Sequence, residues 1–192
     1  MLRKIANAVL LQVALACLMP LTMSAANLVP NPGFETPATG VSPGTTVSYT
    51  DSCEGGTSAA ADWDVWVNTC PGNIATTLVP STAPNGGSYM LHVVTNGDEN
   101  GIYFCCFANH AATRSSVWVY VNSGCVGMGT GDGATTSPTD EITCVTGQWI
   151  EFYKVPNGVS PASEFIVYAA PVSVSGPGAD FYVDNALVVA AH

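Results

Sequence analysis

The strongest constraint on the fold is the near absence of helical periodicity in a chain that is interrupted at short intervals. No stretch after residue 26 keeps apolar residues at i, i+3, i+4 and i+7. Gly, Pro, Ser, Thr and Asn instead separate short runs rich in Val, Tyr, Phe, Trp and Ile, which are typical of strands. The expected strands are 27–35, 63–68, 74–79, 88–95, 101–107, 115–122, 148–155, 164–170 and 181–189. The pattern predicts an all-β fold, a two-sheet antiparallel β-sandwich, with long loops over 36–62 and 123–147.

Alternation within the runs predicts which side chains face the core. In 116–121 the valines occupy one face of the strand, and Trp118 and Tyr120 occupy the other. His92 and Tyr103 likewise oppose apolar neighbours in their runs. We therefore expect one sheet to present an outward aromatic face made of Trp118, Tyr120, Tyr103, His92 and Tyr153. The alternative is that some of these rings pack in the core or under loops.

The first 26 residues resemble a secretion signal rather than part of the fold. Arg3 and Lys4 precede an apolar run, and Ser24-Ala-Ala26 supplies small residues for cleavage before Asn27. A membrane anchor and a lipoprotein signal at Cys17 are the less favoured alternatives. We expect an exported or cell-envelope protein whose single domain is 27–192.

The charge balance excludes one class of partner. Only Arg114 and Lys154 among the basic residues follow residue 26, against all 14 acidic residues. Nucleic-acid binding needs clustered Lys and Arg, so we expect no nucleic-acid partner. We also expect no membrane insertion after cleavage, because no later stretch is apolar enough. The excess of carboxylates is compatible with a solvated acidic surface, with cation binding and with neutral ligands.

The number of cysteines after the expected cleavage site is even, which in an exported chain predicts disulfides. They are Cys53, Cys70, Cys105, Cys106, Cys125 and Cys144. Their spacing favours Cys53–Cys70 and Cys125–Cys144, because each pair closes a loop rich in Gly, Ser and Thr. Crossed pairing stays open.

Several short motifs, in order, resemble the secreted carbohydrate-binding modules of the CenC type, which have a galactose-binding-domain-like jelly-roll fold. The chain opens with Asn27-Leu-Val-Pro-Asn-Pro-Gly-Phe-Glu35 and closes with Phe181-Tyr-Val-Asp184-Asn185. Between them lie Trp63-Asp-Val-Trp66, Gly87-Ser-Tyr-Met-Leu91-His-Val93 and Thr146-Gly-Gln-Trp149. The resemblance spans almost all of 27–192. It implies a jelly-roll β-sandwich whose first and last strands lie together.

The resemblance also implies a structural calcium ion where those two strands meet. The matching acidic residues are Glu35 and Asp184, with backbone carbonyls near Gly33 and in the loop around Gly87 as further ligands. Carboxylate and carbonyl oxygens are the ligands that Ca²⁺ prefers. The alternative is that both acids are ordinary polar residues at strand ends.

The predicted function is non-catalytic binding of a neutral glycan, from a polysaccharide or a cell envelope. Flat aromatic faces contact the C–H surface of a sugar, and polar groups bind its hydroxyls. The candidate ligand-binding residues are Trp118, Tyr120, Tyr103, Trp66 and His92. The alternatives are a structural or adhesive surface protein with the same sandwich and a small jelly-roll hydrolase or lyase. Sequence signatures of serine hydrolases, zinc peptidases and P-loop enzymes are absent, so we expect no catalysis.

Overall fold

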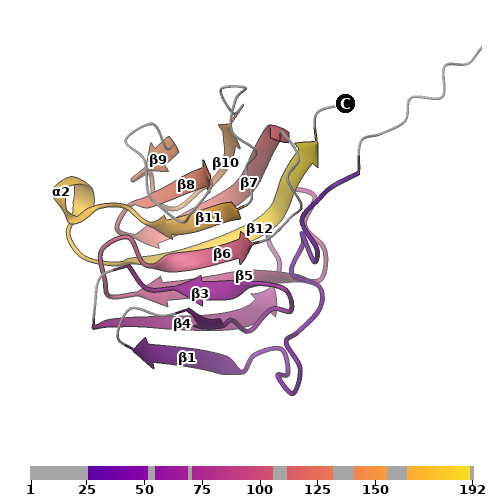
Figure 1. The fold of residues 1–192 in the computed structure, drawn as a ribbon, viewed down its shortest axis with the longest axis horizontal. Coiled ribbons are helices and arrows are strands. Elements are labelled where there is room, and N and C mark those ends of the chain that lie inside the picture. Colours follow the sequence, from indigo (N-terminus) through magenta and orange to yellow (C-terminus); the bar gives the residue numbers. More distant parts are fainter. Residues whose placement is uncertain are drawn as a thin grey trace, which may run out of the picture.

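The fold is a sandwich of two antiparallel six-stranded sheets (Figure 1). The computed structural model describes residues 26–51, 55–68, 71–105, 112–131, 141–154 and 164–190. Sheet I has the strand order β1 (Thr46–Asp51), β4 (Gly72–Pro80), β5 (Tyr89–Thr95), β12 (Ala179–Ala190), β7 (Ala112–Ser123) and β10 (Trp149–Lys154). Sheet II has the order β2 (Gly56–Thr57), β3 (Asp64–Trp66), β6 (Gly101–Cys105), β11 (Glu164–Ala169), β8 (Val126–Gly131) and β9 (Glu141–Thr143). A single turn of helix, α2 (Val172–Ser175), leads into β12. The predicted two-sheet jelly-roll class is confirmed.

The core lies between the sheets and follows the alternation expected from the sequence. Val117, Val119 and Val121 of β7 are fully buried, and Phe181 and Val183 of the neighbouring β12 lie in the same layer. On each strand the residues between them face outward. The alternation therefore decides both the core and the composition of the outer faces.

Trp63 packs in this core against the opening segment of the chain. Its side chain is fully buried, and its ring centroid lies 4.9 Å from that of Phe34 and 6.1 Å from that of Phe165. The indole nitrogen donates a hydrogen bond to the carbonyl of Asn31. A buried Trp needs such a partner for its N–H, and the opening segment supplies it.

The opening segment 27–35 lies against the last strand, as expected, but it is not itself a strand. It makes one isolated bridge, between Asn27 and Val189, and then turns. Asn31 and Phe34 have positive φ angles of 45° and 55°. Pro30 and Pro32 lack a backbone N–H, so this stretch cannot continue a ladder. The apolar pattern correctly indicated burial and wrongly indicated extended structure.

The two segments predicted as long loops contain four strands. β1 and β2 lie within 36–62, and β8 and β9 lie within 123–147. β8 has the sequence Val-Gly-Met-Gly-Thr-Gly, whose glycines favour a loop in a prediction from sequence. In the structure a Cβ at Gly127 would lie 2.7 Å from Cζ of Tyr168. The glycine therefore makes room for a fully buried ring on the neighbouring strand β11.

One of the favoured disulfides is present. Cys125 is bonded to Cys144, next to the residues at which β8 and β9 begin to pair. Cys105 is also disulfide-bonded. Cys53, Cys70 and Cys106 lie outside the described residues, so the second favoured pair stays a prediction.

Within the described ranges, no helix is long and apolar enough to cross a membrane. Residues 1–25 of the expected signal segment lie outside the described residues, so the signal segment stays a prediction.

Candidate functional site

A row of four rings crosses the outer face of sheet I. His92 on β5 pairs in register with Tyr182 on β12, Tyr182 with Tyr120 on β7, and Tyr120 with Trp149 on β10. The ring centroids lie 4.4, 6.0 and 5.6 Å apart in that order. Each ring is partly exposed because its strand neighbours fill the core. We call His92, Tyr182, Tyr120 and Trp149 the aromatic row.

Two hollows open on the outer face beside the aromatic row. The tyrosine hollow, of about 310 Å³, is lined by Thr82, Met90, Tyr120, Asn122 and Tyr182. The glycine hollow, of about 380 Å³, is lined by Val94, Thr95, Ser123, Gly124, Pro177, Gly178, Ala179 and Asp180. Both draw residues from β5, β12 and β7, the central strands of the sheet. Aromatic rings line one hollow, and mainly polar and small residues line the other.

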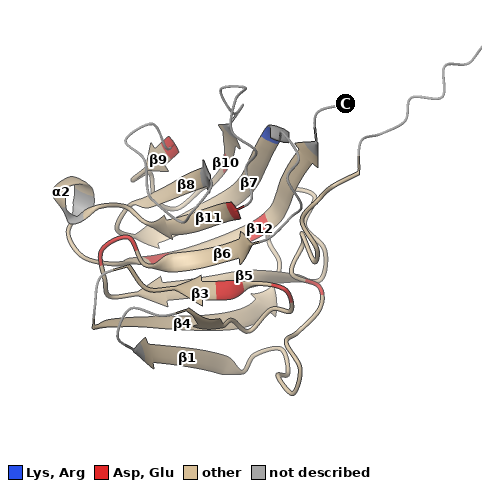
Figure 2. Ribbon diagram, viewed as in Figure 1, with Lys and Arg blue, Asp and Glu red and all other residues tan. Residues whose placement is uncertain are grey.

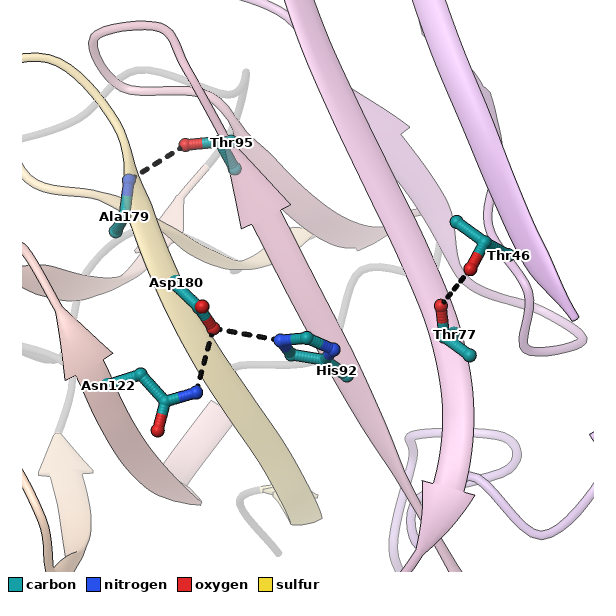
Figure 3. A network of polar contacts seen from close by, with 7 residues as sticks. All are labelled: Thr46, Thr77, His92, Thr95, Asn122, Ala179 and Asp180. Carbon is teal, nitrogen blue, oxygen red and sulfur yellow. Dashed lines mark hydrogen bonds and ion pairs between the residues drawn. The ribbon is translucent and has the colours of Figure 1, made fainter. Parts of the chain in front are cut away.

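A polar network joins the two hollows (Figure 3). Oδ1 of Asp180 lies 2.8 Å from Nε2 of His92 and accepts a hydrogen bond of 2.9 Å from Nδ2 of Asn122. The register of β12 on β7 shifts between Asp180 and Phe181, which leaves Asn122 without a paired residue on β12. Such irregularities re-aim side chains, and here the amide points to the carboxylate (Figure 3).

The structure brings together only part of the predicted aromatic face. His92 and Tyr120 lie in the aromatic row. Trp118 shares their face of sheet I, where it pairs with Glu151 and Asp184, but it lines neither hollow. Tyr153 is on the same face, with Arg114 placed 5.0 Å over its ring.

Tyr103 and Trp66 belong to the other sheet. Tyr103 lies on β6 and pairs with Asp64 and Ile166, and Trp66 lies on β3 and pairs with Gly101. The prediction that Tyr103 shares a face with Trp118 and Tyr120 is therefore wrong. Alternation gives the side of a strand on which a residue lies, and it does not say which sheet the strand joins. Ligand binding by Tyr103 or Trp66 stays a prediction.

Tyr103 borders a third hollow, of about 420 Å³, on sheet II. Its other lining residues are Gly55, Gly56, Thr57 and Asp64. Burial raises the pKa of Tyr103, and the negative charges of Asp64 and Glu164 raise it further. Burial also raises the pKa of Asp64. This hollow is lined by one aromatic ring, so it offers less sugar-contacting surface than sheet I.

Tyr182 and Asp180 are not among the residues predicted for the site, and Trp149 is predicted only as part of a motif. Tyr182 and Asp180 alternate with the buried Phe181 and Val183, which was a usable signal for an outward position. The value of these residues at the site depends on their neighbours across β5, β7 and β10. Those neighbours are set by the strand order.

Glu35 and Asp184, the predicted metal ligands, converge at one end of the sandwich. A Cβ built on Gly33 would lie 3.8 Å both from Oδ1 of Asp184 and from Cγ of Glu35. A Cβ on Gly86 would lie 2.7 Å from Oδ2 of Asp184, and one on Gly87 would overlap the Glu35 carboxylate. The loop 81–88 is thus pressed against both acids, and its glycines allow the approach.

The Asp184 carboxylate is fully buried and is held by two donors. Ser81 Oγ donates to its Oδ2 at 2.6 Å, and the backbone N–H of Asn185 donates to its Oδ1 at 2.7 Å. Burial raises the pKa of Asp184 to about 6; these two hydrogen bonds oppose the rise, and the nearby Glu35 charge adds to it. Glu35 accepts hydrogen bonds from the backbone N–H groups of Ser88 and Tyr89, both at 3.0 Å.

The donor atoms at this end of the sandwich are hard oxygens, which fit calcium rather than a softer metal. Within the described ranges, no group of three or more His, Cys, Asp or Glu residues is placed to hold a metal. A cation between Glu35 and Asp184 would therefore take its remaining ligands from hydroxyl or backbone oxygens and water.

Comparison with solved structures finds similar folds at low sequence identity. TmCBM61, solved in complex with β-1,4-galactotriose, is 16% identical with a TM-score of 0.48, covering 87% of this chain and 100% of that one. The K2 cleaved adhesin domain of Lys-gingipain (Kgp) is 10% identical with a TM-score of 0.50, covering 77% and 99%. A family 11 carbohydrate-binding module from Clostridium thermocellum, in complex with a β-1,3-1,4-mixed-linked tetrasaccharide, is 11% identical with a TM-score of 0.45, covering 76% and 96%.

These likenesses concern the fold. Several of the similar structures are carbohydrate-binding modules, and the CenC type is not singled out among them. No protein-family model matches the sequence, and no curated protein matches it either.

Proposed function

We propose that the protein is a non-catalytic binding module that takes a neutral glycan on the outer face of sheet I. The observation that carries the proposal is the aromatic row beside two hollows, joined by the network of Asp180, His92 and Asn122. Sugar sites combine ring faces for C–H surface with a few fixed polar groups for hydroxyls. This face of the sheet has both.

The charges on the molecule favour an uncharged ligand. Figure 2 shows Asp and Glu residues on several strands and loops, and Arg114 is the one Lys or Arg among the described side chains. Arg114 lies at the start of β7, over Tyr153 and 4.0 Å from Glu151. The Asp180 carboxylate borders the glycine hollow, and neither hollow is lined by a guanidinium that could bind a uronate or a sulfate.

A glycan array on the protein from residue 27, with matched variants, tests the proposal. Tyr120→Ala and Tyr182→Ala should each lower the affinity for every bound glycan at least about tenfold, because each removes a ring that borders the tyrosine hollow. Tyr153→Ala is the matched control, since it removes an exposed tyrosine from the same face that lines neither hollow. Equal losses for Tyr153→Ala and Tyr120→Ala would contradict the proposed site.

A structural or adhesive surface protein is the second candidate. It is favoured by the packing within the aromatic row, where Tyr120 is inclined at 68° to Tyr182 and at 60° to Trp149. Rings inclined in this way contact one another as cross-strand pairs do, and such pairs stabilise a sheet without a ligand. A protein that binds no glycan, and whose Tyr120→Ala variant loses thermal stability, would support this candidate.

We also propose a structural calcium ion between Glu35 and Asp184. The support is a fully buried Asp184 carboxylate beside a second carboxylate, with no basic side chain in contact among the described residues. Calcium should raise the melting midpoint of chelator-treated protein, and it should have no such effect on Glu35→Gln. An equal midpoint with calcium and with chelator would contradict the ion.

The export proposal rests on residues 1–26 of the sequence alone. Expression of the full chain in a secreting host should yield a protein that begins at Asn27, as read by N-terminal sequencing. A protein retained in the cytoplasm with Met1 intact would contradict it.

A further inference from the structure

The two hollows lie one after the other along β12, at Asp180 and Tyr182. Val94 and Asp180 line the glycine hollow, and Met90 and Tyr182 line the tyrosine hollow. Val94 and Met90 are four residues apart on β5, which corresponds to about 13 Å of strand. That length exceeds a single sugar ring and runs parallel to β12, so the site has room for successive units of a chain.

Asp180 lines the glycine hollow and is bonded to Asn122, which lines the tyrosine hollow. Its Oδ1 already contacts His92 and Asn122, which hold the carboxylate in one orientation. Among the described residues none donates a hydrogen bond to Oδ2, and the side chain is 34% exposed in the wall of the glycine hollow. Asp180 therefore offers a fixed, charged acceptor to a ligand. Hydrogen bonds from hydroxyl groups to a carboxylate are about twice as strong as those between neutral groups.

The two hollows differ in chemistry in a way that matches the two aspects of a sugar. Phenol rings and the Met90 side chain border the tyrosine hollow, where a sugar face would lie. Gly124 and Gly178 leave the backbone of the glycine hollow uncovered by side chains. The Ala179 N–H there donates a hydrogen bond of 3.2 Å to Oγ1 of Thr95. The wall of this hollow ends at the Asp180 carboxylate, which would accept a hydrogen bond from a sugar hydroxyl.

Building on the proposed glycan-binding function, we propose that the ligand is an uncharged linear oligosaccharide that lies along β12 across both hollows, and that Asp180 determines its selection by accepting a hydroxyl hydrogen bond at Oδ2. A single sugar fills one hollow only and binds weakly. A uronate places a second carboxylate beside Asp180 and is rejected, because like charges repel at short range.

The test is a titration of the protein from residue 27, monitored by intrinsic fluorescence, with a set of probes that differ in length and in charge. The probes are galactose, β-1,4-galactotriose, glucose, cellotetraose and trigalacturonate, extended to the linear neutral glycans that bind on the array. The affinity of the best oligosaccharide should exceed that of its monosaccharide at least about tenfold, and trigalacturonate should not bind.

Substitutions separate the role of Asp180 from a general loss of charge. Asp180→Ala should weaken oligosaccharide binding about 10- to 100-fold, and Asp180→Asn, which keeps an acceptor oxygen without the charge, should weaken it less. Glu151→Gln is the matched control, since it removes a carboxylate from the same face outside both hollows and should bind as the unmodified protein does. Melting midpoints verify that each variant is folded.

The outcomes distinguish this inference from the function on which it rests. Equal affinity for monosaccharide and oligosaccharide, or unchanged binding by Asp180→Ala, overturns the inference and leaves the proposed function standing. A preference for uronates overturns the inference and also the neutral-glycan part of the proposed function. Absence of binding to every glycan on the array overturns both.

Discussion

Asp184 is the residue whose environment departs most from that of an ordinary surface acid. It lies fully buried under the loop 81–88, and burial raises its pKa to about 6. The folded protein, without a bound cation, therefore holds a proton on Asp184 more tightly than the unfolded chain, whose carboxyl titrates near 3.8. A raised pKa of an acid makes stability fall with rising pH across that interval.

The raised pKa of Asp184 predicts how the stability of the protein depends on pH. In the presence of chelator, the melting midpoint should fall between about pH 4 and pH 6, and Asp184→Asn should remove this part of the fall, because the amide does not ionise. Thermal unfolding followed by circular dichroism at several pH values measures it. An Asp184→Asn protein with the slope of the unmodified protein would contradict the assignment.

Gly127 is a second residue with a defined structural reason. A Cβ there would lie 2.7 Å from Cζ and 2.9 Å from the hydroxyl of the fully buried Tyr168. Gly127→Ala should therefore destabilise the protein by about 1–3 kcal/mol through overpacking. Urea unfolding measures the loss. The same substitution in a Tyr168→Leu background should cost less, and equal costs in both backgrounds would show that the two side chains do not interact.

Strands in the middle of the sheets were predicted well because their alternation is strong. β4, β5, β7, β11 and β12 correspond to predicted runs, and Val117, Val119 and Val121 occupy the expected inner face. The strands that the sequence did not predict are β1, β2, β8 and β9, which lie at or near the edges of the sheets. Strands there are buried on one side, so they need few apolar residues. β1 has only Val47 and Tyr49 packed against the core.

The Cys125–Cys144 disulfide closes the segment that contains the glycine-rich β8 and the three-residue edge strand β9. Replacing both cysteines by alanine should lower the free energy of unfolding by about 3 kcal/mol in the chain-entropy account of a loop of this size. Denaturant unfolding of the double variant measures it. A single Cys125→Ala variant of unchanged stability would contradict a stabilising role.

The side chain of Asn27 and the backbone hydrogen bonds of Leu28 and Ala186 join the two ends of the described chain. Asn27 accepts hydrogen bonds from the Val188 N–H at 2.9 Å and the Val29 N–H at 3.1 Å, and it donates one to the Ala186 carbonyl at 2.9 Å. The opening segment carries Phe34 into the core and Glu35 to Asp184. Asn27 thus couples the N-terminal segment to β12, which lies between β5 and β7 in sheet I.

Asn27→Ala should therefore lower the free energy of unfolding by about 1–3 kcal/mol, because it leaves backbone groups without partners. A shift of the urea midpoint at constant m-value measures the loss. Asn73→Ala is the control, since the side chain of Asn73 makes no hydrogen bond within the described part of the chain. Equal shifts in the two variants would contradict a special role for Asn27.

The sequence by itself determined the β class of this chain and the inner and outer faces of its central strands. Both are local or follow from period-two alternation, which a linear pattern contains. The spacing of the cysteines favoured the Cys125–Cys144 pair, and the resemblance of the motifs implied that the two ends meet. The tertiary structure alone decided which strands became neighbours. It placed Tyr182 and Asp180 of β12 beside His92, Tyr120 and Asn122, and it moved Tyr103 and Trp66 to the opposite sheet. Strand order is settled by long-range packing of the whole core, so a site built across strands appears only when the sheets are assembled.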